Sequence, residues 1–155
     1  MLFGTHILPT LTMKNCLSLA LALVLSPFLR AEVPGAFVKE INGVEAVQLL
    51  KTETAAKKAD PTKPPLIVLD VRTADEFATQ HIPGAINVDF LKADFKAGLA
   101  PLPKDQPALV HCAAGGRSAK ALEVLKAAGF TKIYHLKDGF KGWIAAGGPV
   151  EKKMP

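Results

Sequence analysis

A cysteine stands at the head of a short stretch whose residue types could do chemistry. The stretch Cys112–Ser118 reads Cys-Ala-Ala-Gly-Gly-Arg-Ser, and it lies between the apolar residues 108–110 and a helix-like stripe. A loop that leads into a helix N-terminus directs backbone N–H groups into one concavity, where they can hold an anion. We expect Gly115 and Gly116 to supply the positive φ or tight conformations that such a loop needs.

The neighbours of Cys112 favour a reactive thiolate. The loop N–H groups and the permanent charge of Arg117 are expected to hold the pKa of Cys112 below the ordinary value of about 8.5, which makes the thiol nucleophilic near neutral pH. The alternative is a buried cysteine that merely ends a strand, because cysteine is among the most buried residue types. That alternative leaves the glycines, Arg117 and the helix start unexplained.

The N-terminal segment has the pattern of a signal peptide. Lys14 precedes the apolar stretch Leu17–Leu25, a proline then breaks the stretch, and Ala31 offers a small residue for cleavage. We expect Met13 to be the start and the mature chain to be exported, to the periplasm or out of the cell. A retained membrane anchor is the alternative, although Leu17–Leu25 is shorter than the roughly 20 apolar residues of a spanning helix.

The chain holds two cysteines, Cys16 and Cys112. Cys16 lies inside the segment that is expected to be removed, so the exported chain would hold Cys112 without a disulfide partner of its own. A spare thiol in an oxidising compartment is a liability. The count therefore favours a chemical role for Cys112.

Length and composition are typical of one globular domain, with 155 residues of which 49% are apolar and 21% charged. We assign residues 1–31 to the upstream residues and signal peptide and residues 32–155 to the domain, whose core spans about 38–150. The net charge is +5, but Lys and Arg are scattered and no basic run is interleaved with aromatic residues. We therefore expect no nucleic-acid partner.

Strand-like and helix-like segments alternate around the Cys112–Ser118 loop. The apolar run Leu66–Val71 suits a strand buried on both faces, which indicates a parallel sheet. Acceptor-x-x-Glu patterns at Asn42 and Thr73 start helices, the first through about Leu50, and Lys51–Pro65 is expected to be an exposed connection. The remaining strands are expected at 37–41, 86–88, 108–111 and 132–136, and the remaining helices within 89–107, at 117–128 and at 139–146. The order predicts an α/β domain, a central parallel sheet of about five strands with helices on both faces.

Four motifs resemble those of single-domain rhodanese-type sulfurtransferases. They are the loop Cys112–Ser118 (family pattern Cys-x-x-Gly-x-Arg-Ser), Asp70-Val71-Arg72 with Glu76-Phe77, Gln80–Asn87 (family pattern Gly-His-Ile-Pro-Gly-Ala-x-Asn), and the closing segment from Gly129-Phe130 to Trp143. All four occur in the family's order. The chain departs from the family at Gln80 and Asp138, where glycine is usual, and in the long stretch Lys51–Pro65.

The resemblance implies a two-step sulfur transfer through a persulfide on Cys112. Loop amides from Ala113, Ala114, Gly115, Gly116 and Arg117 would stabilise the persulfide. Arg117 would hold the oxyanion of a donor such as thiosulfate, and Ser118 would bond within the loop or cap the helix. Cyanide, a thiol or a redox protein would accept the sulfur. We expect no metal, no organic cofactor and a monomer.

Loop length separates this chemistry from a related one. Four residues lie between Cys112 and Arg117, whereas cysteine phosphatases, including rhodanese-fold ones, keep one more to hold a tetrahedral phosphoryl group. The shorter loop favours a sulfurtransferase. A non-catalytic sulfur carrier or protein-binding module and an oxyanion enzyme, either a phosphatase or an arsenate reductase, stay open as alternatives.

Other polar residues are given supporting roles. Asp70 and Arg72 end a strand, and we expect them to pair with Glu76 or to brace the loop, in a structural role. His81, His111 and His135 fall in three separate segments, and their spacing predicts no metal site. His111 precedes Cys112, but neighbours on a strand point to opposite faces, so His111 is not expected to act as its base.

Overall fold

The computed structural model describes residues 35–152. The expected signal peptide, its cleavage point and Cys16 lie outside these residues. Within the described part of the chain, no helix is both long and apolar enough to cross a membrane.

A five-stranded parallel sheet forms the centre of the described domain, in the order β1-β5-β4-β2-β3. The strands are β1 (Phe37–Ile41), β2 (Ile67–Asp70), β3 (Ile86–Asn87), β4 (Ala108–His111) and β5 (Lys132–Leu136). All residues of β2 and β4 are buried. Such burial explains their near-continuous apolar sequences. The predicted α/β class and parallel sheet are confirmed.

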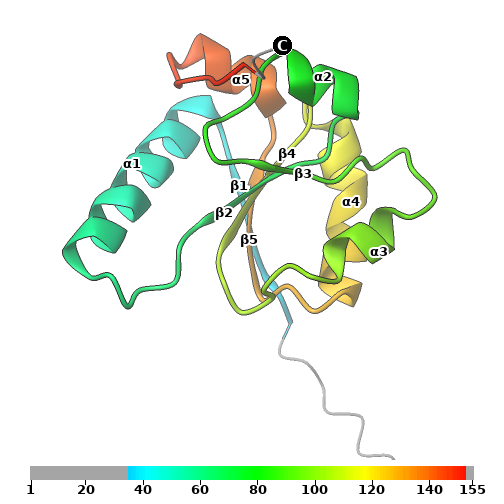
Figure 1. Cartoon of the computed structure of the whole chain (residues 1–155), viewed down its shortest axis with the longest axis horizontal. Coiled ribbons are helices and arrows are strands. Elements are labelled where there is room, and N and C mark those ends of the chain that lie inside the picture. The colour runs from blue at the N-terminus through cyan, green and yellow to red at the C-terminus, as the bar shows by residue number, and fades with distance from the viewer. Residues whose placement is uncertain (1–34, 153–155) are drawn as a thin grey trace, which may run out of the picture. The chain divides into compact units, whose positions relative to one another are not determined.

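Helices cover both faces of this sheet (Figure 1). On one face lie α1 (Gly43–Ala59) and α5 (Gly139–Ala145); on the other lie α3 (Phe95–Leu99) and α4 (Gly116–Ala127). The short helix α2 (Ala74–Thr79) follows β2. Consecutive residues of β4 point to opposite faces, so Leu109 packs in the core with Trp143 of α5, whereas Val110 packs in the core with Leu125 of α4. These two cores hold in place the strands whose ends carry the site residues.

The first helix is longer than expected. The prediction that it ends at about Leu50 and that Lys51–Pro65 is a connection is wrong, because α1 continues to Ala59. This segment contains helix-forming residues and no proline before Pro61, so nothing stops the helix. Its side chains are mostly exposed, so it shows no apolar stripe in the sequence. The Lys57 ammonium group donates to the carbonyls of Pro61 and Lys63, at 2.6 and 2.8 Å. These bonds fix the chain that follows the C-terminus of α1.

Both predicted capping boxes are confirmed. Asn42 accepts a hydrogen bond from the Glu45 N–H, and the Glu45 carboxylate accepts one from the Asn42 N–H. Thr73 and Glu76 make the same reciprocal pair at the start of α2. Since α2 begins four residues after β2, the box fixes the carboxylate of Glu76 near the carboxyl ends of the strands.

Candidate active site

The candidate active site lies where β4, in the middle of the sheet, ends. Cys112 follows β4 directly and is only 2% exposed, and α4 begins at Gly116. Ligand sites of open α/β sheets form at the carboxyl ends of the strands. The structure thus places the Cys112–Ser118 loop where the sequence predicted it.

The two loop glycines differ in what they contribute. Gly115 has a φ of +89°, and a Cβ there would lie 1.9 Å from the carbonyl oxygen of Lys137. Gly116 is the first residue of α4, lacks a positive φ, and an added Cβ would meet no described atom within 4 Å. The expectation of a special backbone conformation is therefore confirmed for Gly115. It is wrong for Gly116, which is part of helix α4 and has no positive φ.

The start of α5 fixes the direction of the loop backbone. The Phe140 N–H donates to the Cys112 carbonyl at 2.7 Å, and the Lys141 N–H donates to the Ala113 carbonyl at 3.0 Å. Gly139 has a φ of +61°, and a Cβ there would lie 2.5 Å from the Ala114 nitrogen. Because these loop carbonyls are turned toward α5, the loop can direct N–H groups toward the Cys112 sulfur.

Two opposing effects set the acidity of the thiol. Burial raises the pKa of Cys112, but hydrogen bonds from the Ser118 hydroxyl and from the N–H groups of Ser118, Ala114 and Arg117 lower it, and the lowering prevails. The Ser118 Oγ lies 3.5 Å from the Cys112 Sγ. A depressed thiol pKa raises the thiolate fraction near neutral pH. The loop therefore has the character of an anion cradle.

Arg117 is paired with the capping carboxylate of α2. Its Nη1 and Nη2 lie 2.7 and 2.8 Å from the two carboxylate oxygens of Glu76. Chiefly through this hydrogen bonding, the pKa of Glu76 is lowered to about 2 and that of Arg117 is raised. Arginine has five N–H donors, so this pair leaves donors for an oxyanion. The expected pairing of Asp70 or Arg72 with Glu76 is not what the structure shows, since Glu76 pairs with Arg117 and Asp70 pairs with Arg72.

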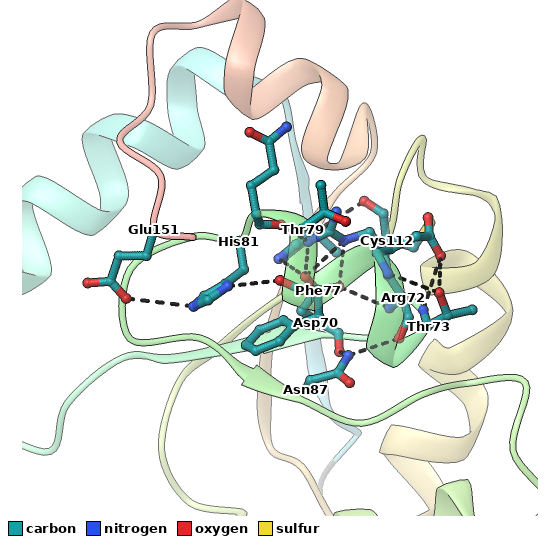
Figure 2. A network of polar contacts seen from close by, with 12 residues as sticks. Asp70, Arg72, Thr73, Phe77, Thr79, His81, Asn87, Cys112 and Glu151 are labelled. Carbon is teal, nitrogen blue, oxygen red and sulfur yellow. Dashed lines mark hydrogen bonds and ion pairs between the residues drawn. The ribbon is translucent and has the colours of Figure 1, made fainter. Parts of the chain in front are cut away.

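Asp70 and Arg72 instead pair with each other at the end of β2, both almost completely buried. The Arg72 Nη2 lies 2.6 Å from the Asp70 carboxylate, and the Asn87 amide donates to the carbonyls of both residues (Figure 2). The Arg72 guanidinium also lies 4.1 Å from the ring centre of Phe140. Since the Phe140 N–H donates to the Cys112 carbonyl, this pair is in a position to brace the loop through Phe140.

His111 is turned away from the sulfur, as the alternation along a strand predicted. Its ring stacks on Phe140, and its Nε2 lies 3.7 Å from the Asp70 carboxylate. Complete burial is the main reason why the pKa of His111 is lowered. A buried neutral imidazole on this face does not serve Cys112 as a base.

His135 is the site residue that sequence reasoning missed. Its Nε2 lies 3.0 Å from the Ser118 Oγ, and its Nδ1 lies 3.5 Å from a carboxylate oxygen of Glu40. The signal that could have found it is the strand register, because His135 pairs with Val110, two residues before Cys112. That register depends on the sheet order, which the sequence alone does not reveal.

Metal ligands are not grouped in the described residues. Across 35–152, no group of three or more His, Cys, Asp or Glu side chains is arranged to hold an ion.

Comparison with known proteins agrees with this geometry. A family model described as the rhodanese-like domain matches residues 49–146. The chain is 40% identical over 78 residues to the probable adenylyltransferase/sulfurtransferase MoeZ of Mycobacterium tuberculosis, a match that covers 50% of this chain but 20% of that protein. It is 30% identical over 107 residues to the thiosulfate sulfurtransferase GlpE of Coxiella burnetii, covering 69% of this chain and 88% of that protein.

The fold has matching solved structures as well. The crystal structure of a rhodanese-like domain from Anabaena sp. is 30% identical, with a TM-score of 0.53, and the match covers 58% of this chain and 95% of that one. The parallel sheet thus has the fold of solved rhodanese-like domains. On the matched residues 49–146, this chain belongs to the rhodanese-like domain family.

Proposed function

We propose that this protein is a sulfurtransferase that carries sulfane sulfur as a persulfide on Cys112. The observation that carries the proposal is the position of Cys112 directly after the central strand β4, with the Ser118 Oγ 3.5 Å from its Sγ. The Ser118 hydroxyl and three loop N–H groups lower the pKa of this buried thiol. Such donors stabilise a sulfur anion at the cysteine. The names of relatives such as the thiosulfate sulfurtransferase GlpE support this assignment.

The first step transfers a sulfur atom to the enzyme. The Cys112 thiolate attacks the outer sulfur of a donor such as thiosulfate, a new S–S bond forms, and the donor's S–S bond breaks. Sulfite leaves with the electron pair of that bond, and Cys112 holds a persulfide anion. The loop N–H groups that held the thiolate can then hold the terminal sulfur.

The second step transfers this sulfur from Cys112 to an acceptor. A nucleophilic acceptor, cyanide or a thiol, attacks the terminal sulfur and Cys112 leaves as a thiolate, so the enzyme returns to its starting state. The cradle that lowers the pKa of Cys112 also makes it a good leaving group. No metal or organic cofactor takes part in either step.

Arg117 is proposed to bind the oxyanion end of the donor. It is held in place by Glu76 at 2.7 and 2.8 Å, so its orientation is set before the donor arrives. The other variable loop positions, Ala113, Ala114 and Gly116, are small and neutral and add no second cation. We infer that donors with a single strongly negative end suit this loop as well as the doubly charged thiosulfate.

Export from the cytoplasm belongs to this proposal. Lys14, the apolar stretch Leu17–Leu25 and Ala31 have the order of a signal peptide. When the full chain is expressed in a bacterium, we expect the periplasmic protein to begin at Glu32. A chain recovered from the membrane with Leu17–Leu25 intact would contradict cleavage and identify an anchor.

The test is a single-turnover reaction of the purified protein with thiosulfate. One equivalent of sulfite per Cys112 is expected at once, followed by thiocyanate when cyanide is added. Cys112→Ser should give neither product and unfold at the same denaturant concentration as the wild type. Sulfite release without turnover by any acceptor would indicate a carrier module. Hydrolysis of an aryl phosphate without sulfite release would show an oxyanion enzyme and refute the proposal.

A further inference from the structure

A line of polar side chains runs from the Cys112 sulfur to the edge of the sheet. Ser118 Oγ lies 3.5 Å from Cys112 Sγ and 3.0 Å from His135 Nε2. On the other side of the imidazole, His135 Nδ1 lies 3.5 Å from a carboxylate oxygen of Glu40. The 3.0 Å distance between Ser118 and His135 is that of a hydrogen bond, and the two 3.5 Å distances on either side are slightly longer than is typical.

The sheet register puts these residues on one face. β5 lies between β1 and β4, and in the register His135 is level with Glu40 on one side and with Val110 on the other. Cys112 is two residues beyond Val110, so its side chain points to the same face as that of Val110. Ser118, in the first turn of α4, closes the gap between the sulfur and the imidazole.

The inner part of this line is buried. Ser118 is fully buried and His135 is 2% exposed. The Nδ1 of His135 has no hydrogen-bond partner in the described part of the chain, and the charged group that faces it is the Glu40 carboxylate. The groups facing the imidazole are thus Glu40 from β1, Ser118 from α4 and, through Ser118, Cys112 after β4. The charge of Arg117 is turned toward Glu76.

Ser118 has one hydroxyl proton, and the Gly115 carbonyl oxygen, 2.9 Å from its Oγ, also accepts it. In two hydrogen-bond arrangements this proton turns from the Gly115 carbonyl into the line between Cys112 and His135. In the first, His135 carries its proton on Nδ1, toward Glu40, and its Nε2 accepts from the Ser118 hydroxyl, which in turn accepts from the Cys112 S–H. In the second, the imidazole is protonated on both nitrogens, its Nε2–H donates to Ser118, and the Ser118 hydroxyl donates to the thiolate. The arrangements differ only in the positions of the protons.

We propose that Ser118 and His135 form a proton relay that receives the proton of the Cys112 thiol. The S–H bond breaks as an O–H bond forms on Ser118, and the original O–H proton of Ser118 passes to His135 Nε2. The electron pair stays on sulfur, and the Glu40 carboxylate faces the imidazolium. Ser118 and His135 are positioning residues in the resting enzyme and move one proton when the thiolate forms.

The relay would lead the proton of a buried thiol to the edge of the sheet. The Cys112 side of the line is 2% exposed, whereas the side chain of Glu40 is 66% exposed at the edge strand. A proton that reaches the imidazole is therefore next to water-accessible carboxylate. The inference rests on the proposed function in that the thiolate is the nucleophile, but thiolate formation itself needs no sulfur donor.

The test is the pH profile of Cys112 alkylation by iodoacetamide in the full chain, without any sulfur donor. His135→Gln is the first variant, because its amide nitrogen can still bind Ser118 but cannot take a proton. We expect roughly tenfold slower alkylation near pH 7, with the midpoint of the profile about one pH unit higher. Glu40→Gln should slow alkylation roughly threefold. Glu123→Gln, which removes an exposed α4 carboxylate paired with Lys126, is the matched control and should change nothing.

The outcomes separate this inference from the proposed function. Glu40 lies on the surface, so Glu40→Gln keeps the test valid even where His135→Gln lowers stability. A Glu40→Gln or His135→Gln profile that superimposes on the wild type in folded protein overturns the relay. Shifted profiles in a protein that forms no persulfide would instead leave the relay standing and refute the sulfur transfer.

Discussion

At the scale of single residues, the site depends on hydrogen bonds that outweigh burial at one sulfur atom. Cys112 is almost completely buried, yet the donors around it lower the pKa of its thiol. Cys112, Arg117 and Ser118 could be predicted from the sequence because they lie within one loop. Glu76 and His135 could not be assigned as their partners, because α2 and β5 approach the loop only in the folded chain.

The ion pair between Glu76 and Arg117 predicts a specific dependence of stability on pH. The folded pKa of Glu76, about 2, lies below its ordinary value of 4.5, so the pair stabilises the fold fully above about pH 4.5 and loses this contribution as pH falls toward 2. The Glu76 side chain is 35% exposed, and screening reduces the contribution to about 1 kcal/mol. Denaturant unfolding of wild type and Glu76→Gln should show this difference at pH 7.

Acid provides the control for that prediction. Toward pH 2 the two free energies of unfolding should converge, because Glu76 is then protonated in the wild type. A difference that stays constant from neutral to acid pH would show that Glu76→Gln acts through packing and not through the charge.

The two loop glycines predict opposite effects of the same substitution. Gly115→Ala would place a Cβ 1.9 Å from the Lys137 carbonyl oxygen at a positive φ, and we expect a loss of more than about 2 kcal/mol together with most of the activity. Gly116→Ala meets open space in a helix, and it should be neutral or stabilise by about 0.5 kcal/mol. Unfolding curves and sulfite release measure both. Equal effects at the two positions would contradict the loop conformation.

At the scale of secondary-structure elements, those marked by apolar runs or capping patterns were predicted better than helix segments that lie exposed to solvent. β4 and β5 have the predicted bounds. For β4 the signal was the apolar run of a strand buried on both faces. The end of α1 was missed because its last turns bury little, so only the helix propensities of Lys51–Ala59 mark them. Hydrophobic patterns in the sequence arise from burial, so they do not mark the part of a helix that extends beyond the core.

The longer α1 can be tested by glycine substitution. Ala55 lies on the exposed side of the helix interior, so Ala55→Gly should lower the free energy of unfolding by about 1 kcal/mol. Ala59→Gly, at the last residue of α1, is the control and should cost much less. An effect near zero at Ala55 would support the connection that the sequence predicted instead.

At the scale of the whole molecule, the sheet brings distant segments together at the ends of its strands. The order β1-β5-β4-β2-β3 places Glu40 beside His135 and puts β4 in the centre. Strand order follows from long-range packing, which periodicity along a sequence does not express. The α/β class was therefore predictable from the alternation of elements, whereas the line of side chains from Cys112 to Glu40 was not.

The two cores should differ in how they affect activity. Trp143 lies in α5, the helix whose first residues bind the carbonyls of Cys112 and Ala113, whereas Leu99 lies in α3 on the other face. Trp143→Phe and Leu99→Val should each cost about 1–2 kcal/mol of stability. Sulfite release should fall several-fold in Trp143→Phe and stay near wild type in Leu99→Val, at a temperature where both are folded. Equal losses would show that α5 has no special part in holding the loop.

The persulfide on Cys112 is the central claim, and intact-protein mass spectrometry tests it directly. After incubation with thiosulfate and removal of excess donor, the protein should gain the mass of one sulfur atom. Peptide mapping should place this sulfur on Cys112, and cyanide should remove it. A protein whose mass is unchanged by thiosulfate and by other sulfane-sulfur donors, although Cys112 is reduced and accessible to alkylation, would contradict the account.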